Sequence, residues 1–128
     1  MREILFRGKD AETGKWRYSM TIARHAYNDD EIFSYYIGAG HSIIDGKTLG
    51  QYTGLTVPSG KIFEHDVVTA KFKSNGARFN FAVKYSNEKG CYVFDNGCVK
   101  VPFCDIRSVR IIGNIHDNPA LLEVGNNA

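Results

Sequence analysis

The sequence lacks the patterns that mark membrane-spanning, secreted and zinc-bound chains. It has no apolar run of membrane length, and residues 1–4 do not resemble the start of a signal peptide. Its three cysteines, Cys91, Cys98 and Cys104, are odd in number and form no CxxC pair. Free thiols in a reducing compartment are the simplest interpretation. We therefore expect a cytoplasmic protein with no membrane partner.

The sequence also has little net charge. The 128 residues carry a net charge of +2, which is too small to imply a nucleic-acid ligand by itself. Hydrophobic residues make up 43% of the chain and charged residues 23%, a balance that argues against disorder. Eight phenylalanines, seven tyrosines and 13 glycines favour β-structure, because aromatic side chains pack on pleated faces and glycines form turns.

The first half of the chain predicts short strands joined by turns. Alternating apolar residues predict strands at residues 2–7, 15–22 and 32–37, with a turn at residues 10–14. One face of the second strand is expected to be half-buried, and it carries Trp16, Tyr18, Met20 and Ile22. Residues 23–31 are harder to interpret and predict a loop or one helical turn. Asp45-Gly46 predicts a type I′ turn within a tight hairpin of residues 42–49.

The second half predicts five short strands between residues 67 and 115. Turn residues separate them at 74–76, 86–90 and Asn96-Gly97. The fourth strand should end near Pro102, followed by a one-turn connector at residues 104–107 and a last strand at 109–115. Gly113 indicates a bulge or a close approach of the backbone, and Asn118-Pro119 predicts the start of a short helix. Short strands with tight turns are typical of a small barrel, since closure removes exposed edges.

Glu64, His65 and Asp66 form an acidic cluster where the first of these strands begins. Two carboxylates on one face of a strand can bind a divalent cation or perform acid–base chemistry. The alternative, which we prefer, is that they cap turn amides and stay solvated at the strand entrance. His116-Asp117 is a second such neighbour pair, but adjacent residues rarely reach triad geometry. We assign no catalytic residue, metal ligand or cofactor.

Further candidates for chemistry give weaker signals. His25 and His41 fall in loop-like sequence. Cys91 and Cys98 fall in expected strands, where buried and unreactive thiols are the usual outcome.

Four cations lie on the strand face opposite the aromatic residues of the hairpin at residues 67–85. They are Lys71, Lys73, Arg78 and Lys84. If that face is exposed, it presents a patch that can contact phosphates. A solvated strand face has the same composition, and no aromatic residue stands among these cations to stack a base.

Four segments resemble the YopX family of phage and prophage proteins: residues 2–10 (REILFRGKD), 51–55 (QYTGL), 60–68 (GKIFEHDVV) and 112–122 (IGNIHDNPALL). The motif positions, which we expect to be structural, are Gln51, Thr53, Gly54, Gly60, Glu64, Asp66, Gly113, Asn114, Asn118 and Pro119. His65 stands where that family has glycine, so a positive φ need not be present there. The resemblance implies a compact β-rich carboxy-terminal region behind a smaller amino-terminal part. It implies no activity, because the family has no assigned catalytic residues.

We therefore expect a mostly β (β-rich α+β) protein. Residues 51–128 should form a small SH3-like barrel with a short terminal helix, packed against a β-rich lobe of residues 1–50. The expected function is that of a phage or prophage accessory protein in the bacterial cytoplasm, acting as a non-enzymatic module that binds a protein partner. A nucleic-acid-binding barrel and a metal-dependent enzyme are the alternatives, and a homo-oligomer remains open.

Overall fold

The computed structural model describes residues 2–27, 32–38, 40 and 42–125. Strands account for 57% of the described residues and only a small share is helical, so the prediction of a mostly β protein is confirmed. The chain divides into two compact units, Met1–Gly54 and Leu55–Ala128. Within the described residues, no helix has the length and apolarity needed to cross a membrane.

The first unit begins with an antiparallel hairpin of β1 (Phe6–Lys9) and β2 (Trp16–Ser19). The predicted turn is confirmed: Asp10 Oδ1 accepts hydrogen bonds from the backbone N–H groups of Glu12 and Thr13. The first strand starts at Phe6, later than expected. β1 also pairs with the start of β6 (Gly50–Val57), so β1 is an inner strand and β2 an edge strand.

The prediction that one face of residues 15–22 is buried is wrong for two of the four side chains on that face. Tyr18 is 54% exposed and Met20 is 70% exposed. Alternation shows which side chains share a face, but not whether another element covers that face. Trp16 is half-buried, and the Arg7 guanidinium lies over its ring, 4.6 Å from the centroid.

A three-stranded antiparallel sheet follows, made of β3 (Ile22–Tyr27), β4 (Ile32–Ile37) and β5 (Ser42–Ile44). β4 matches the prediction, whereas the loop or helical turn expected at 23–27 is a strand; residues 28–31 and His41 lie outside the described residues. The prediction of a hairpin turn at Asp45-Gly46 is also wrong. Asp45 has φ −70° and its side chain accepts from Lys47 N, which caps the 3₁₀ helix η2 (Gly46–Thr48).

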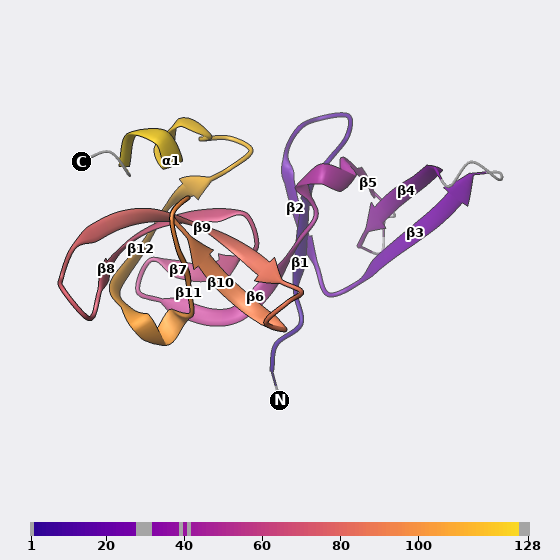
Figure 1. Ribbon diagram of the computed structural model, residues 1–128. Coiled ribbons are helices and arrows are strands. Elements are labelled where there is room, and N and C mark those ends of the chain that lie inside the picture. Colours follow the sequence, from indigo (N-terminus) through magenta and orange to yellow (C-terminus); the bar gives the residue numbers. More distant parts are fainter. Residues whose placement is uncertain (1, 28–31, 39, 41, 126–128) are drawn as a thin grey trace. The chain divides into compact units, whose positions relative to one another are not determined.

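Five antiparallel strands form the main sheet of the second unit, in the order β11-β10-β9-β8-β12, and they curl into a half-barrel (Figure 1). Their bounds are β8 (Asp66–Phe72), β9 (Arg78–Ser86), β10 (Cys91–Asp95), β11 (Lys100–Val101) and β12 (Ile106–Asn114). The predicted number of strands is confirmed, as are the turns at 74–76 and 86–90. The closer likeness to an SH3 barrel stays a prediction.

The concave side of this sheet holds the core. The cluster contains Ile62 of β7 (Gly60–Phe63) together with Val68, Ala70, Phe81, Val83, Phe94 and Ile106. On the opposite side, Val67 and Ala82 are cross-strand partners that are 0% and 2% exposed. The helix α1 (Ala120–Gly125) packs against β9, where Asn80 Nδ2 donates to Leu121 O at 2.8 Å. The convex side is therefore covered near α1.

β12 is longer than predicted and carries two irregularities. It begins at Ile106, because the 3₁₀ helix η3 (Phe103–Asp105) takes only part of the expected connector. Its register with β8 shifts between Arg107 and Arg110 and again between Ile111 and Gly113. The bulge expected at Gly113 is thus confirmed, and β11 is shorter than the strand expected before Pro102.

Candidate functional site

The acidic cluster at the start of β8 is a tight turn rather than an open metal site. Asp66 is only 3% exposed, and its Oδ2 accepts a hydrogen bond from Phe63 N at 2.8 Å. The expected capping of a turn amide is confirmed for Asp66, but the expectation that this carboxylate is solvated is wrong. His65 has φ 74°, so the turn keeps a positive φ at the position where the resembling family has glycine.

His65 is held beside the end of β12. Its N–H donates to Val83 O, and its carbonyl accepts from Ile115 N. Its ring nitrogen Nδ1 lies 3.3 Å from His116 Nε2, with the two rings nearly perpendicular at 89°. Asn114 Oδ1 accepts from the N–H groups of His116 and Asp117, which orders this corner. The corner thus ties the β7–β8 turn to the end of the last strand.

This corner does not assemble a metal-binding group. No set of three or more His, Cys, Asp or Glu side chains is placed to bind a metal within the part of the chain that is described. His25 lies in strand β3, although the sequence predicted a loop there.

We predict that His65→Val lowers the free energy of unfolding by about 1 kcal/mol more than His65→Gly does. Both variants lose the contact with His116, but a β-branched side chain is strained at a positive φ, whereas glycine is not. Urea unfolding of the two variants checks this. Equal stabilities would show that the backbone at residue 65 relaxes out of the left-handed region.

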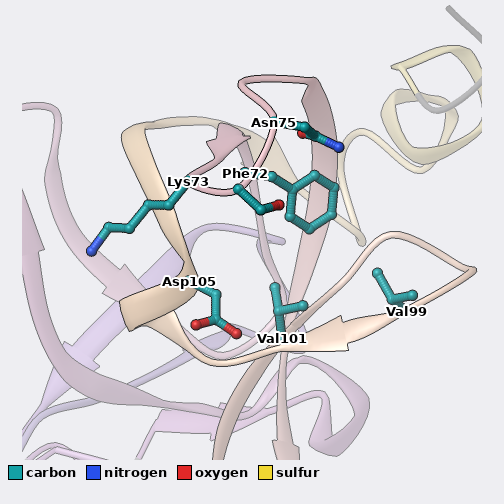
Figure 2. Close-up of a pocket in the computed structure, with 7 residues that line it drawn as sticks. Phe72, Lys73, Asn75, Val99, Val101 and Asp105 are labelled. Atoms are coloured by element: carbon teal, nitrogen blue, oxygen red, sulfur yellow. The ribbon is translucent and has the colours of Figure 1, made fainter.

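A groove lies at the open mouth of the half-barrel. It has a volume of about 660 Å³ and is lined by Phe72, Lys73, Ser74, Asn75, Val99, Val101 and Asp105, which we call the mouth groove. Figure 2 shows Phe72, Val99 and Val101 around the cavity, with Asp105 near Val101 and the Lys73 side chain extending away. Val99 is 46% exposed. The groove thus combines an apolar floor with polar side chains at its rim, as ligand sites do.

The four cations predicted as a patch do not act as one group. Lys73 lies at the mouth groove, and Lys84 Nζ forms an ion pair with Asp95 Oδ2 at 3.1 Å. Burial raises the pKa of the Asp95 carboxyl, but hydrogen bonds from Gly97 N and Lys84 outweigh it and hold the pKa below its ordinary value. Only Lys71 and Arg78 are neighbours, as cross-strand partners of β8 and β9.

Two further cations complete this face, and the sequence analysis missed them. Arg107 is the β12 partner of Lys71, and Arg110 is the partner of Thr69. We call Lys71, Arg78, Arg107 and Arg110 the basic strip. The sequence does not show that the two arginines share a face, because they are three residues apart. A β-bulge with one extra residue, at Ser108 with φ 54°, places both arginines on the convex face. The available signal was Ile106, an apolar residue directly before Arg107, because neighbouring residues of a strand point to opposite faces and a buried Ile106 directs Arg107 to the other face.

The other family-motif residues lie in strands, turns and the segment before α1, where they contribute to the fold. Gln51 is paired with Phe6 in the β1–β6 ladder, and Thr53 is 7% exposed. Gly54 and Gly60 have positive φ angles of 89° and 137°. Asn118 Oδ1 accepts from Asn114 N, and Pro119 directly precedes α1. Glu64 is half-buried in the turn before β8.

The cysteines correct one expectation. Cys91, Cys98 and Cys104 are all free and exposed, whereas the first two were expected to be buried. Cys91 does point away from the apolar face of β10, but the opposite face is open to solvent at this end of the strand.

Comparison with known proteins identifies the family of the chain. No curated protein matches the sequence. A family model described as "YopX protein" matches residues 5–123, which is nearly the whole chain. The match includes the turn at Asp66, the corner at Asn114 and the start of α1. The chain belongs to the YopX family.

Proposed function

We propose that this chain is a non-catalytic binding module that takes an extended segment of a protein partner in the mouth groove. The observation that carries the proposal is the groove itself, about 660 Å³ in volume, with the 46% exposed Val99 on its wall. Pockets of this size can bury most of the surface of a small organic ligand, so the groove has room for apolar side chains of a peptide.

An extended peptide is favoured as the occupant because β11 is an edge strand. In the described part of the sheet, β11 pairs with β10 on one side only. A peptide added along the other side can form main-chain hydrogen bonds while an apolar side chain enters the groove beside Val101. The Asp105 carboxylate, which lies near Val101, gives the groove a negative charge that favours a partner segment with a positively charged residue next to its apolar anchor.

Binding is favoured over catalysis by what the candidate catalytic residues do. Asp66 accepts a buried backbone N–H, and His65 is engaged with His116, so both side chains support the turn. The family match and the three exposed free thiols support an accessory role in the bacterial cytoplasm, where thiols stay reduced.

The test selects peptides from a displayed random library against the full chain and measures their affinities by calorimetry. We expect selected peptides to share an apolar anchor residue and to bind with a micromolar dissociation constant. Val99→Lys should weaken binding at least about tenfold, or roughly 1.4 kcal/mol, because it places a charge in the apolar wall of the groove.

Ile43→Lys is the matched control. Ile43 is 47% exposed, nearly equal to Val99, but it belongs to β5 in the other unit. Its affinity should stay within about twofold of the wild type. An equal loss in both variants would contradict the proposal, as would a selection that enriches no peptide. If Val99→Lys instead converts a dimer to a monomer in sedimentation, a second copy of this chain is the occupant.

A further inference from the structure

A row of cations crosses three strands of the convex sheet face. Arg107, Lys71 and Arg78 are successive cross-strand partners on β12, β8 and β9. Directly paired residues of antiparallel strands project from the same face, about 5 Å apart. The Cβ atoms of the three residues therefore span about 10 Å, and Arg110 lies in the next row, opposite Thr69. The Arg107 guanidinium reaches over the β8–β9 turn, with Nη2 beside Gly76.

These charges are not neutralised by the fold. Arg78 Nη1 donates to Thr69 Oγ1 at 3.2 Å, and none of the four cations forms an ion pair with a carboxylate in the described residues. Arg78, Arg107 and Arg110 are exposed, and Lys71 is half-buried. Like charges placed directly opposite each other destabilise a sheet. The row of cations therefore does not stabilise the folded chain, whereas a bound anion would reduce the repulsion between the cations.

The surroundings of the basic strip restrict its ligand. Asn80, in the row of Arg110, donates to Leu121 O, so α1 closes the face next to the strip. A ligand therefore runs along the row of cations and across the strands. In the described part of the chain, no aromatic or large apolar side chain stands among the four cations to stack a base or enter a lipid bilayer. Guanidinium groups bind phosphate oxygens through two parallel hydrogen bonds.

We propose that the basic strip binds the phosphate backbone of a nucleic acid without reading its sequence. The basic strip uses other side chains than the mouth groove, although the two surfaces meet at the β8–β9 turn, where Ser74 and Asn75 line the groove and Arg107 lies beside Gly76. The excess of cations supports the assignment. The unit Leu55–Ala128 has nine Lys and Arg against seven Asp and Glu, so it carries the whole net charge of the chain.

Fluorescence anisotropy with labelled 20-nucleotide single strands and 20-base-pair duplexes of mixed sequence tests the proposal. With three to four phosphates contacted, the logarithm of the association constant should fall with the logarithm of salt concentration, with a slope of about −2 to −3 for single strands. Arg107→Glu should weaken binding at least about tenfold at low salt and make the slope shallower by about one contact. Changes of base sequence should alter the affinity less than about threefold.

Two matched controls distinguish an effect of the basic strip from an effect of the net charge of the protein. Lys89→Glu makes the same change of charge in the β9–β10 turn, away from the strip, and should leave the affinity within about twofold of the wild type. Lys84→Gln should also have little effect, since Lys84 is already paired with Asp95. Arg107→Gln, in contrast, should weaken binding measurably without adding a negative charge. It replaces Arg107→Glu if the latter fails to unfold cooperatively.

Three results would overturn the proposal. The first is no binding at about 100 μM protein in low salt, where even non-specific complexes form. The second is an equal loss of affinity in the Lys89→Glu and Arg107→Glu variants. The third is equal or tighter binding of polyglutamate or of phosphatidylserine vesicles, which would assign the strip to an acidic protein or a membrane surface.

Discussion

Replacing Asp66 with alanine is expected to lower the free energy of unfolding by about 3 kcal/mol. The carboxylate is 3% exposed and accepts the hydrogen bond of Phe63 N, in a residue that is itself only 5% exposed. Alanine leaves that N–H buried with no acceptor from this side chain, which costs the desolvation of the donor in addition to the lost charged hydrogen bond. Urea unfolding followed by fluorescence measures the difference.

Asp66→Asn is the matched variant for this prediction. Its amide oxygen can still accept from Phe63 N, so we expect a loss of about 1 kcal/mol, well below that of alanine. Elemental analysis of the wild type and Asp66→Ala tests the metal-enzyme alternative with the same samples. A stoichiometric metal ion in the wild type that disappears in Asp66→Ala would contradict the structural role and favour a metal site.

Gly113→Ala is expected to destabilise the protein by about 2 kcal/mol. A Cβ atom at this position would overlap Asn118 Oδ1 and lie 2.9 Å from Leu121 Cδ1, closer than real Cβ contacts allow. Relief of the clash must move α1 or the segment before it, and both are held by specific bonds, from Asn114 N to Asn118 Oδ1 and from Asn80 to Leu121 O. Forcing an extra carbon into a packed site typically costs about 1–3 kcal/mol.

Gly40→Ala is the control for this substitution. Among the described residues, no atom lies within 4 Å of a Cβ added at Gly40, and the φ angle of Gly40 is not positive. Alanine there should change the free energy of unfolding by less than about 0.5 kcal/mol. Equal effects of the two substitutions would show that backbone entropy, and not the approach of Asn118 and Leu121, explains the requirement for glycine at 113.

Features determined by neighbouring residues were predictable from the sequence. The hairpin after β10 follows from Asn96, whose Oδ1 accepts from Cys98 N and Val99 N and so closes the turn within four residues. The β8–β9 turn likewise follows from Gly76, which has φ 72°. Such turns need no knowledge of distant parts of the chain.

Features determined by distant residues were not predictable in the same way. Tyr18 and Met20 alternate as a buried strand does, but they lie on or beside the edge strand β2 and are exposed. Asp45-Gly46 has the composition of a type I′ turn, yet Asp45 instead caps η2, and Thr48 Oγ1 both donates to Asp45 O and accepts from Lys9 N. That second bond comes from β1, far away in the sequence.

The basic strip shows the same limit at the candidate site. Lys71 and Arg78 are joined by one hairpin and were grouped correctly, whereas Arg107 is brought beside Lys71 only by the pairing of β12 with β8. The bulge at Ser108 also breaks the alternation that would have shown Arg107 and Arg110 on one face. Lys84 was grouped with them by its strand, but Asp95 on the neighbouring strand neutralises it.

Mapping amide chemical shifts shows whether the mouth groove binds a protein segment. ¹⁵N-labelled full-length protein is titrated with a selected peptide, and the shifted amides are assigned. We expect the largest changes at residues 72–75, Val99, Val101 and Asp105, with little change in the basic strip. Changes centred on the Met1–Gly54 unit, or no saturable change at millimolar peptide, would contradict it.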